Sequence, residues 1–248
     1  MLRIFRADLH IHTCLSPCAD LTMSPRRIVE KAVEKGLDMI AVCDHNSAEN
    51  ARAAAAAGKQ YQVTVIPGME ITSSEEVHLL ALFDQPATLL KLQATVYKHL
   101  PTGKNREDIF GEQIIANEWD EVDGFNQRLL MSAVSLTLKE LVEKIHRLGG
   151  LAILAHIDRE VFGVFGQLGF LPENLEPDAL EISAQITPTQ AVAQFPGIET
   201  YTLISSSDAH GLEEIGKRTT TFLLEAPTLG EIRKAFRKQD GRNVMIDD

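Results

Sequence analysis

Cysteine is scarce in this sequence, which has only Cys14, Cys18 and Cys43 among 248 residues. A small and odd number of cysteines in a chain of this length does not form a disulfide framework, so we expect a reducing compartment, the cytoplasm. Long apolar runs are also lacking, and none approaches the roughly 18 residues that a membrane span requires. The first apolar run breaks at Arg6 and Asp8, which argues against a signal peptide. We therefore expect no membrane association.

Positive charge is in deficit, because 24 lysines and arginines face 35 aspartates and glutamates and give a formal net charge of -11. An acidic surface repels a polyphosphate backbone, which disfavours broad nucleic-acid binding but not a local basic site. Aromatic residues are few, with one tryptophan and three tyrosines, so no stripe of base-stacking side chains is apparent. The hydrophobic fraction of 44% is nevertheless that of an ordinary globular protein and excludes a disordered chain.

Short apolar runs alternate with helical patterns along most of the chain. The runs predict strands at 2–9, 39–43, 63–66, 77–83, 151–155, 179–183, 202–206 and 219–224. Capping residues and periodicity predict helices at 24–35, 47–58, 137–149 and 228–238. Strands separated by helices favour a parallel sheet, hence an α/β barrel or a doubly wound sheet, formed by residues 1–248 as a single domain.

Residues 84–136 do not fit this alternation. They contain a helical pattern at 87–100, a polar stretch at 101–112 and a possible hairpin from 113 to about 124. We interpret this segment as an insertion in the barrel that could act as a lid.

Histidine and acidic residues gather at the ends of the predicted strands. His10 and His12 close the first strand, where alternate side chains point the same way and can reach one ion. Asp208 and His210 repeat this spacing after a late strand. The other candidates at strand ends are His45, Glu70, His78 and His156. Because the carboxyl ends of parallel strands converge on one face, we expect a metal cluster there, of Zn, Mn, Fe, Ni or Co.

The cysteines leave alternatives open. Cys14 and Cys18 flank the loop after the first strand, where they are either small buried hydrophobes or residues with a redox or ligand role. Cys43 lies inside a predicted strand and is expected in the core.

Five short motifs resemble those of the PHP family (polymerase and histidinol phosphatase). In order they are Asp8-Leu9-His10-Ile11-His12-Thr13, Asp44-His45-Asn46, Gly68-Met69-Glu70 with His78, Ala155-His156, and Ser207-Asp208-Ala209-His210. The resemblance implies a distorted (β/α)7 TIM-like barrel, two or three divalent ions (Zn, Mn or Fe) and phosphoester hydrolysis.

The resemblance also implies a set of ligands for each ion. One ion would be held by His10, His12, Glu70 and Asp208. Glu70 would bridge to a second ion held by His78 and His156. His45 and His210 would hold a third with a carboxylate from the loop after the first motif, for which Asp20 is the candidate. Members of the family with a short loop tend to place Ser-Asp-Gly soon after the first histidine pair, whereas Leu15-Ser16-Pro17-Cys18-Ala19 precedes Asp20 here.

These residues predict a metal-dependent phosphatase that acts on a small phosphomonoester or a nucleotide, with a metal-bridging hydroxide as nucleophile. Asp44 is expected to orient metal ligands, and Arg159 either clamps a phosphate oxygen or forms a surface ion pair with Asp158 or Glu160. One alternative is a nuclease that trims RNA or DNA ends. Another is a non-catalytic, metal-loaded regulatory module.

Overall fold

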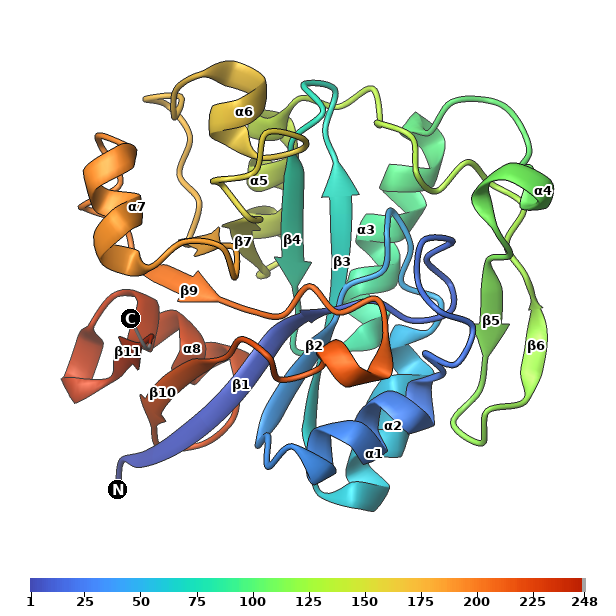
Figure 1. Cartoon of the computed structure of the whole chain (residues 1–248), viewed down its shortest axis with the longest axis horizontal. Coiled ribbons are helices and arrows are strands. Elements are labelled where there is room, and N and C mark those ends of the chain that lie inside the picture. The colour runs from blue at the N-terminus through green and yellow to red at the C-terminus, as the bar shows by residue number, and fades with distance from the viewer. Residues whose placement is uncertain (247–248) are drawn as a thin grey trace.

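The computed structural model describes residues 1–246 and contains a nine-stranded sheet that curves into a distorted, nearly closed α/β barrel (Figure 1). The sheet strands are β1 (Arg3–Ile11), β2 (Met39–Val42), β3 (Thr64–Thr72), β4 (His78–Leu82), β7 (Leu151–Leu154), β8 (Ala179–Ile182), β9 (Leu203–Ser205), β10 (Thr220–Leu224) and β11 (Asn243–Met245). Their spatial order is β11-β10-β1-β2-β3-β4-β7-β8-β9. Seven of them, from β1 to β9 in that order, form the barrel wall, which agrees with the predicted fold class.

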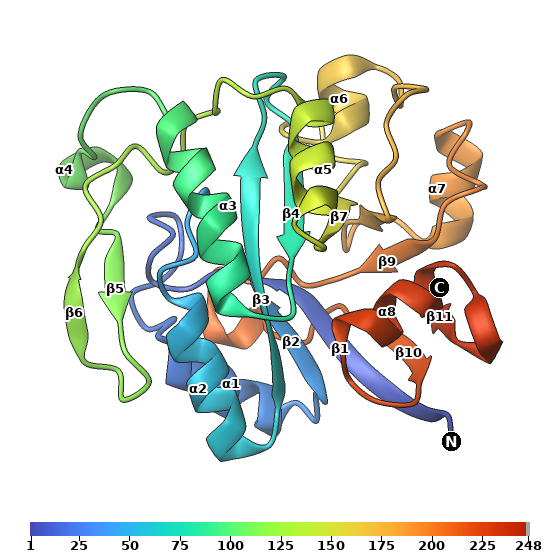
Figure 2. The same ribbon diagram turned by 180° about the vertical axis from the view of Figure 1, so that it is seen from behind.

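The helices of the chain are α1 (Pro25–Glu34), α2 (Ala51–Tyr61), α3 (Pro86–His99), α4 (Glu107–Phe110), α5 (Leu138–Arg147), α6 (Val164–Leu168), α7 (Pro188–Gln194) and α8 (Leu229–Phe236), with short 3-10 turns at Leu212–Glu214 and Gln239–Gly241. Helices α2, α3 and α5 pack against the barrel wall, whereas α4 lies away from it and has no buried residue. Figure 2 shows α3 and α5 on the back of the sheet, α3 against β3 and α5 against β7, with α2 below α3. None of the helices within residues 1–246 is long and apolar enough to cross a membrane.

The barrel closes at one end only. At its lower end β10 pairs antiparallel with β1 from Arg3 to Ala7 and separates β1 from β9. At the other end a single bridge joins Ile11, the last residue of β1, to Ala209 in the segment after β9. The Thr220 hydroxyl also links β10 to β9, since it accepts from the Ser205 N–H and donates to the Ser205 carbonyl.

The expectation of a parallel sheet is wrong for β10, which pairs antiparallel with β1, and for β4, which pairs antiparallel with both β3 and β7. For β4 the physical reason is the connection at 73–77, which is too short for a parallel crossover and makes a hairpin instead. This reversal determines where His78 lies. As the first residue of an antiparallel strand, it reaches the same end of the barrel as the last residues of the parallel strands.

Strand β3 is longer than predicted, because it continues through Pro67-Gly68 to Thr72. The Pro67 carbonyl accepts from the Phe83 N–H, so the proline does not interrupt the sheet. Gly68 is needed for close packing, since a Cβ there would lie 2.6 Å from the Cys43 sulfur and 2.9 Å from a Leu82 methyl. Glu70 therefore belongs to the strand and does not follow it.

Helix α2 also differs from the prediction. It begins after Asn50, not after Ser47, and continues past Gly58 to Tyr61. Gly58 does not end the helix but allows it to approach the sheet, because an added Cβ would lie 2.5 Å from Val65 Cγ2 and 2.6 Å from the Val63 carbonyl oxygen.

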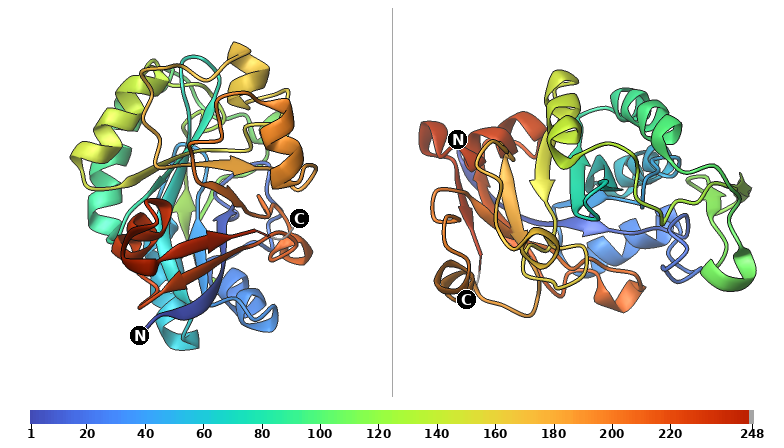
Figure 3. Two further views of the ribbon diagram at one scale, coloured as in Figure 1. Left: turned by 90° about the vertical axis from the view of Figure 1, so that its left-hand side faces the viewer. Right: turned by 90° about the horizontal axis from the view of Figure 1, so that it is seen from above.

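The segment 84–136 contains α3, the short helix α4, which the polar stretch did not predict, and the expected hairpin of β5 (Ile114–Ala116) and β6 (Val122–Phe125). Helix α3 belongs to the main core through Leu89, Leu92 and Val96. The hairpin stands at the edge of the molecule (Figure 3). It is attached to the loop after β1, because the Ile114 N–H donates to the Cys14 carbonyl at 2.9 Å.

Candidate metal centre

The closed end of the barrel brings together residues from both ends of the chain. His10 and His12 come from the end of β1, and Asp208 comes from the segment that the Ile11–Ala209 bridge fastens beside it. The Nε2 atoms of the two histidines lie 3.2 Å apart. Oδ1 of Asp208 lies 3.3 Å from the first and 3.1 Å from the second. Two imidazole nitrogens and one carboxylate oxygen thus face a common point.

Glu70 lies at the middle of the cluster and is 1% exposed. Its oxygens are within 3.4 Å of nitrogens of His10 (3.4 Å), His12 (3.4 Å), His45 (3.0 Å), His78 (2.8 Å) and His156 (3.2 Å). Both carboxylate oxygens are used, Oε1 facing His10, His78 and His156 and Oε2 facing His12 and His45. This is the arrangement required of a carboxylate that bridges two ions.

The buried nitrogens fit metal ligation better than a hydrogen-bond network. Within residues 1–246, Nδ1 of His45, His78 and His156 is buried without a hydrogen-bond partner, although two of them lie close to Glu70. Buried polar atoms are nearly always satisfied, so unpaired lone pairs that converge on a carboxylate indicate a cation site. Three groups of donors could each hold an ion: His10 with His12 and Asp208, His45 with Glu70 and His78, and His12 with His45 and His210.

Hydrogen bonds fix which nitrogen of several histidines faces the centre. Nδ1 of His10 contacts Glu181 at 3.0 Å, and Nδ1 of His12 contacts the Ser16 hydroxyl at 3.0 Å. Nδ1 of His210 donates to the Asp208 carbonyl at 2.8 Å. Each ring is thereby oriented with Nε2 free to act as a ligand, as partners behind metal-binding histidines commonly arrange.

Asp44 supports the same ligands indirectly. Its carboxylate is buried and accepts from the N–H and hydroxyl of Thr13 and from the hydroxyl of Ser16. Ser16 is the contact of His12 Nδ1 and also accepts from the His45 N–H. Asp44 therefore holds the loop after β1 in place and reaches His12 through Ser16, and its role in orienting metal ligands stays a prediction.

Glu181, in β8, was missed by the sequence reasoning. It is 2% exposed, and its Oε2 accepts from the His156 N–H at 3.1 Å as well as contacting His10. The available signal was a single acid inside an otherwise apolar strand, a position where a charged side chain needs a partner.

Arg159 does not form the expected surface ion pair with Asp158 or Glu160, and its contact with a phosphate stays a prediction. Its Nη1 lies 2.6 Å from Oδ2 of Asp208, whereas Asp158 accepts from the N–H and hydroxyl of Ser183. The arginine side chain is 39% exposed, and its contact with Asp208 involves Nη1.

Asp20 is not brought to the cluster. Its side chain is exposed and its carboxylate accepts from the Thr22 N–H at 2.7 Å. Cys18 lies there instead: burial alone would raise the pKa of its thiol, but hydrogen bonds with His210 and His45 lower it to about 7. Cys18 is exposed, so the interpretation of a buried hydrophobe is wrong for this residue, while it is correct for Cys14 and Cys43.

The protonation states suit cation binding. Although burial would raise it, the neighbouring His78, His10 and His45 hold the pKa of the Glu70 carboxyl well below its ordinary value. Burial lowers the pKa of His78 to about 4, and burial with two neighbouring imidazoles lowers the pKa of His12. The Glu70 carboxylate and the imidazoles of His12 and His78 are thus in the forms that ligate metals. Although burial would lower both, the pKa of His10 is instead raised by Asp208, Glu181 and Glu70, and the pKa of His45 is raised by Glu70.

Local backbone conformation also marks this site. Asn46, His156, Phe162 and Asp208 have positive φ angles of 48°, 25°, 63° and 50°. Such angles are unfavourable for residues other than glycine and cluster at functional sites. Phe162 covers the outer face of His78, with ring centroids 4.3 Å apart and planes at 5°. The positive φ angles thus lie at or next to the proposed ligands, in the segments that follow the strands.

Known proteins share this fold. The sequence is 25% identical over 190 residues to a 5'-3' exoribonuclease of Haemophilus influenzae, covering 60% of this chain and 68% of that protein. Among solved structures, the lesion-specific endonuclease Q of Pyrococcus furiosus has a TM-score of 0.71 at 20% identity and covers 98% of this chain. This chain spans only 58% of that endonuclease. A structure described as a metal-dependent phosphoesterase, from Bifidobacterium adolescentis, has a TM-score of 0.56 at 18% identity and covers 85% of this chain and 91% of its own.

A family match covers more than half of the chain and includes most of the residues of the histidine and carboxylate cluster. The PHP domain matches residues 8–163, from the start of the first motif to just beyond His156 and Arg159. Proteins of the PHP family are metal-dependent hydrolases, which argues against the non-catalytic alternative. The chain belongs to the PHP domain family.

Proposed function

We propose that this protein is a metal-dependent phosphatase that hydrolyses a phosphomonoester on a small metabolite or nucleotide. The observation that carries the proposal is the buried Glu70 carboxylate with five histidine nitrogens around its two oxygens. The proposal includes the single-domain organisation of residues 1–248 and the cytoplasmic setting that the unpaired cysteines suggest.

The proposed ligands fall into two overlapping groups around Glu70. His10, His12 and Asp208 would hold one divalent ion with Glu70, and His78 and His156 would hold the second. Two such ions supply Lewis acidity, which activates water near neutral pH and neutralises the phosphate oxygens. Asp44 would keep the His12 imidazole oriented through Ser16, and Glu181 would orient the His10 imidazole directly.

The shape of the mouth supports a terminal phosphate as the substrate group. The ligand side chains of β1, β3 and β4 are at most 6% exposed, whereas His210 is 30% and Arg159 is 39% exposed. A phosphate that enters would meet the Arg159 guanidinium. Arginine binds phosphate oxygens in a planar, bidentate manner, so this contact would orient the substrate and add positive charge.

Nucleic-acid ends are the second candidate substrate. The similarity to a 5'-3' exoribonuclease of Haemophilus influenzae supports it. The similarity to an endonuclease Q in complex with a 27-mer duplex substrate supports a nucleic-acid substrate but not the choice of strand ends. The net charge of -11 favours the small substrate, because a protein that binds a strand must neutralise several phosphates.

Salt dependence separates the two substrates. The protein, reconstituted with Mn or Zn, would be assayed on mononucleotides and on 5'-phosphorylated oligonucleotides from low to moderate salt. We expect turnover of mononucleotides that changes little with salt, since few counterions are released. A steep loss of activity on oligonucleotides with salt, together with no turnover of mononucleotides, would reverse the ranking of the two substrates.

A further inference from the structure

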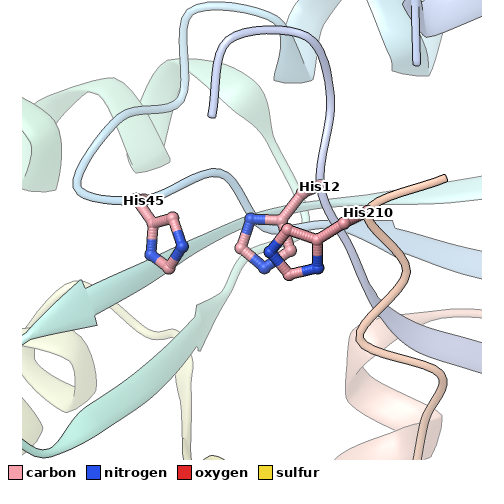
Figure 4. Close-up of side chains that lie close together, drawn as sticks. All are labelled: His12, His45 and His210. Atoms are coloured by element: carbon pink, nitrogen blue, oxygen red, sulfur yellow. The ribbon is translucent and has the colours of Figure 1, made fainter. Parts of the chain in front are cut away.

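The three-histidine group at the mouth contains more donors than the Glu70-centred pair of sites requires. One nitrogen each from His12, His45 and His210 lies within 4.8 Å of the other two. Figure 4 shows these imidazoles gathered from three separate segments. His12 and His210 stack with centroids 4.2 Å apart, and His12 and His45 lie 4.6 Å apart. His45 is 4% exposed, and its Nδ1 lies 3.0 Å from Oε2 of Glu70, so His45 stands between the Glu70-centred sites and this group.

The sulfur atom of Cys18 lies next to two of these three histidines. The Cys18 side chain is in hydrogen-bonding contact with both His45 and His210, although it is outside the buried centre. The contact is built into the fold. The Asp20 N–H donates to the His210 carbonyl at 2.8 Å, and the Ala19 N–H donates to the Ser16 carbonyl at 2.9 Å, which closes the turn around Cys18.

We propose that Cys18, and not Asp20, is the ligand from this loop for a third divalent ion held with His45 and His210. A thiolate with two imidazoles makes a softer site than the carboxylate and imidazole groups around Glu70. Zinc accepts mixed cysteine and histidine ligands in tetrahedral sites, whereas manganese prefers oxygen ligands. The third site therefore selects zinc or cobalt over manganese, while the inner pair accepts either. This inference rests on the metal dependence of the family and not on the identity of the phosphorylated substrate.

Cobalt titration tests the ligand directly, without an activity assay. Metal-free protein would be titrated with Co²⁺, and the near-ultraviolet thiolate-to-cobalt charge-transfer absorption would be recorded. We expect this absorption in the wild type and its complete loss in Cys18→Ser, with one equivalent less metal bound per folded chain. Cys18 is exposed, so this substitution does not disturb the core, and circular dichroism verifies folding.

Two matched variants complete the design. Asp20→Asn removes the alternative carboxylate and should retain the absorption and the full metal content. Cys14→Ser removes the other cysteine of the loop, whose sulfur faces Asn50 and the Ile114 carbonyl, and should also retain both. Zinc should protect Cys18 from alkylation by iodoacetamide. The proposal is overturned if Asp20→Asn loses the third ion, if Cys18→Ser keeps the absorption, or if zinc-loaded protein alkylates at Cys18 as fast as metal-free protein.

Discussion

At the scale of single residues, the site is governed by the cost of burying charge. A carboxylate that is 1% exposed is unstable unless cations or donors surround it, and the Glu70 carboxylate has five imidazoles around it. The same neighbours affect His10. Burial alone would lower its pKa, but Asp208, Glu181 and Glu70 raise it well above the usual value. A divalent ion would displace such a proton and take over its role.

Glu70→Gln and His45→Ala should therefore differ in their effects. Glutamine keeps the shape of Glu70 but removes the charge that two ions share, so we expect loss of both inner ions and a fall in kcat/KM of at least about a thousandfold. His45→Ala should remove the outer ion and leave residual activity. The measurements are metal content per folded chain and steady-state turnover. If His45→Ala strips every ion while Glu70→Gln keeps them, Glu70 is not the bridge.

The motifs allowed most of this centre to be predicted residue by residue. The eight donors at 10, 12, 45, 70, 78, 156, 208 and 210 do lie together, because each sits at or beside the end of a strand. Glu181 could not be recognised from a motif, since its role depends on the distance to His10 across the barrel. Asp20 failed because the loop turns its carboxylate back onto Thr22, a local contact that spacing does not reveal.

At the scale of helices and strands, the apolar periodicity located the elements well but not their directions or ends. Antiparallel β4 follows from the short 73–77 connection, and the ends of α2 and β3 were misjudged because glycine and proline were interpreted as stops. At Gly58 and Gly68 the missing side chain instead permits close packing. The sequence alone does not distinguish these two uses of glycine.

Gly58 offers a direct comparison with Gly230, a helical glycine of α8. We expect Gly58→Ala to lower the free energy of unfolding by about 1–3 kcal/mol, because the added methyl would overlap Val65 and the Val63 carbonyl. Gly230→Ala should be neutral or raise it by up to about 1 kcal/mol, since nothing lies within 4 Å and alanine favours the helix. Urea unfolding of both variants measures the difference. If both variants lose the same free energy of unfolding, close packing at Gly58 is not the cause of the loss in Gly58→Ala.

The pair of Glu231 and Arg242 joins α8 to the segment before β11. Two contacts of 2.9 and 3.1 Å link the carboxylate and the guanidinium, and the pKa of Glu231 is lowered from 4.5 to about 2 by hydrogen bonding to Arg242. A lowered pKa in the folded state gives stability that is complete above pH 4.5 and lost as the pH falls towards 2.

Replacing Glu231 by Gln should therefore destabilise the protein at neutral pH and progressively less below pH 4.5. Thermal unfolding of the variant and the wild type between pH 7 and pH 3 tests this, with the exposed Glu173→Gln as control. A stability difference that stays constant over this range would contradict the assigned role.

At the scale of the whole molecule, the proposed ligands unite segments that the sheet itself joins only weakly. They come from β1, β3 and β4 and from the loops after β2, β7 and β9. Near them the barrel is closed by the single Ile11–Ala209 bridge. Bound ions would therefore connect the two edges of the barrel wall, so metal affinity and global stability should be coupled.

Removal of metal should lower the melting temperature of the whole protein. A ligand at about a hundred times its Kd adds about 2.7 kcal/mol to the folded state, which corresponds to roughly 5–10 °C for a domain of this size. We expect a shift of at least this size on chelation, its reversal by added Zn or Mn, and parallel loss and recovery of hydrolysis. Glu70→Gln should show a much smaller shift, because it already lacks the shared charge that draws two cations into the mouth. Metal-free protein that melts at the wild-type temperature and still hydrolyses phosphate esters would refute both the coupling and the metal-dependent mechanism.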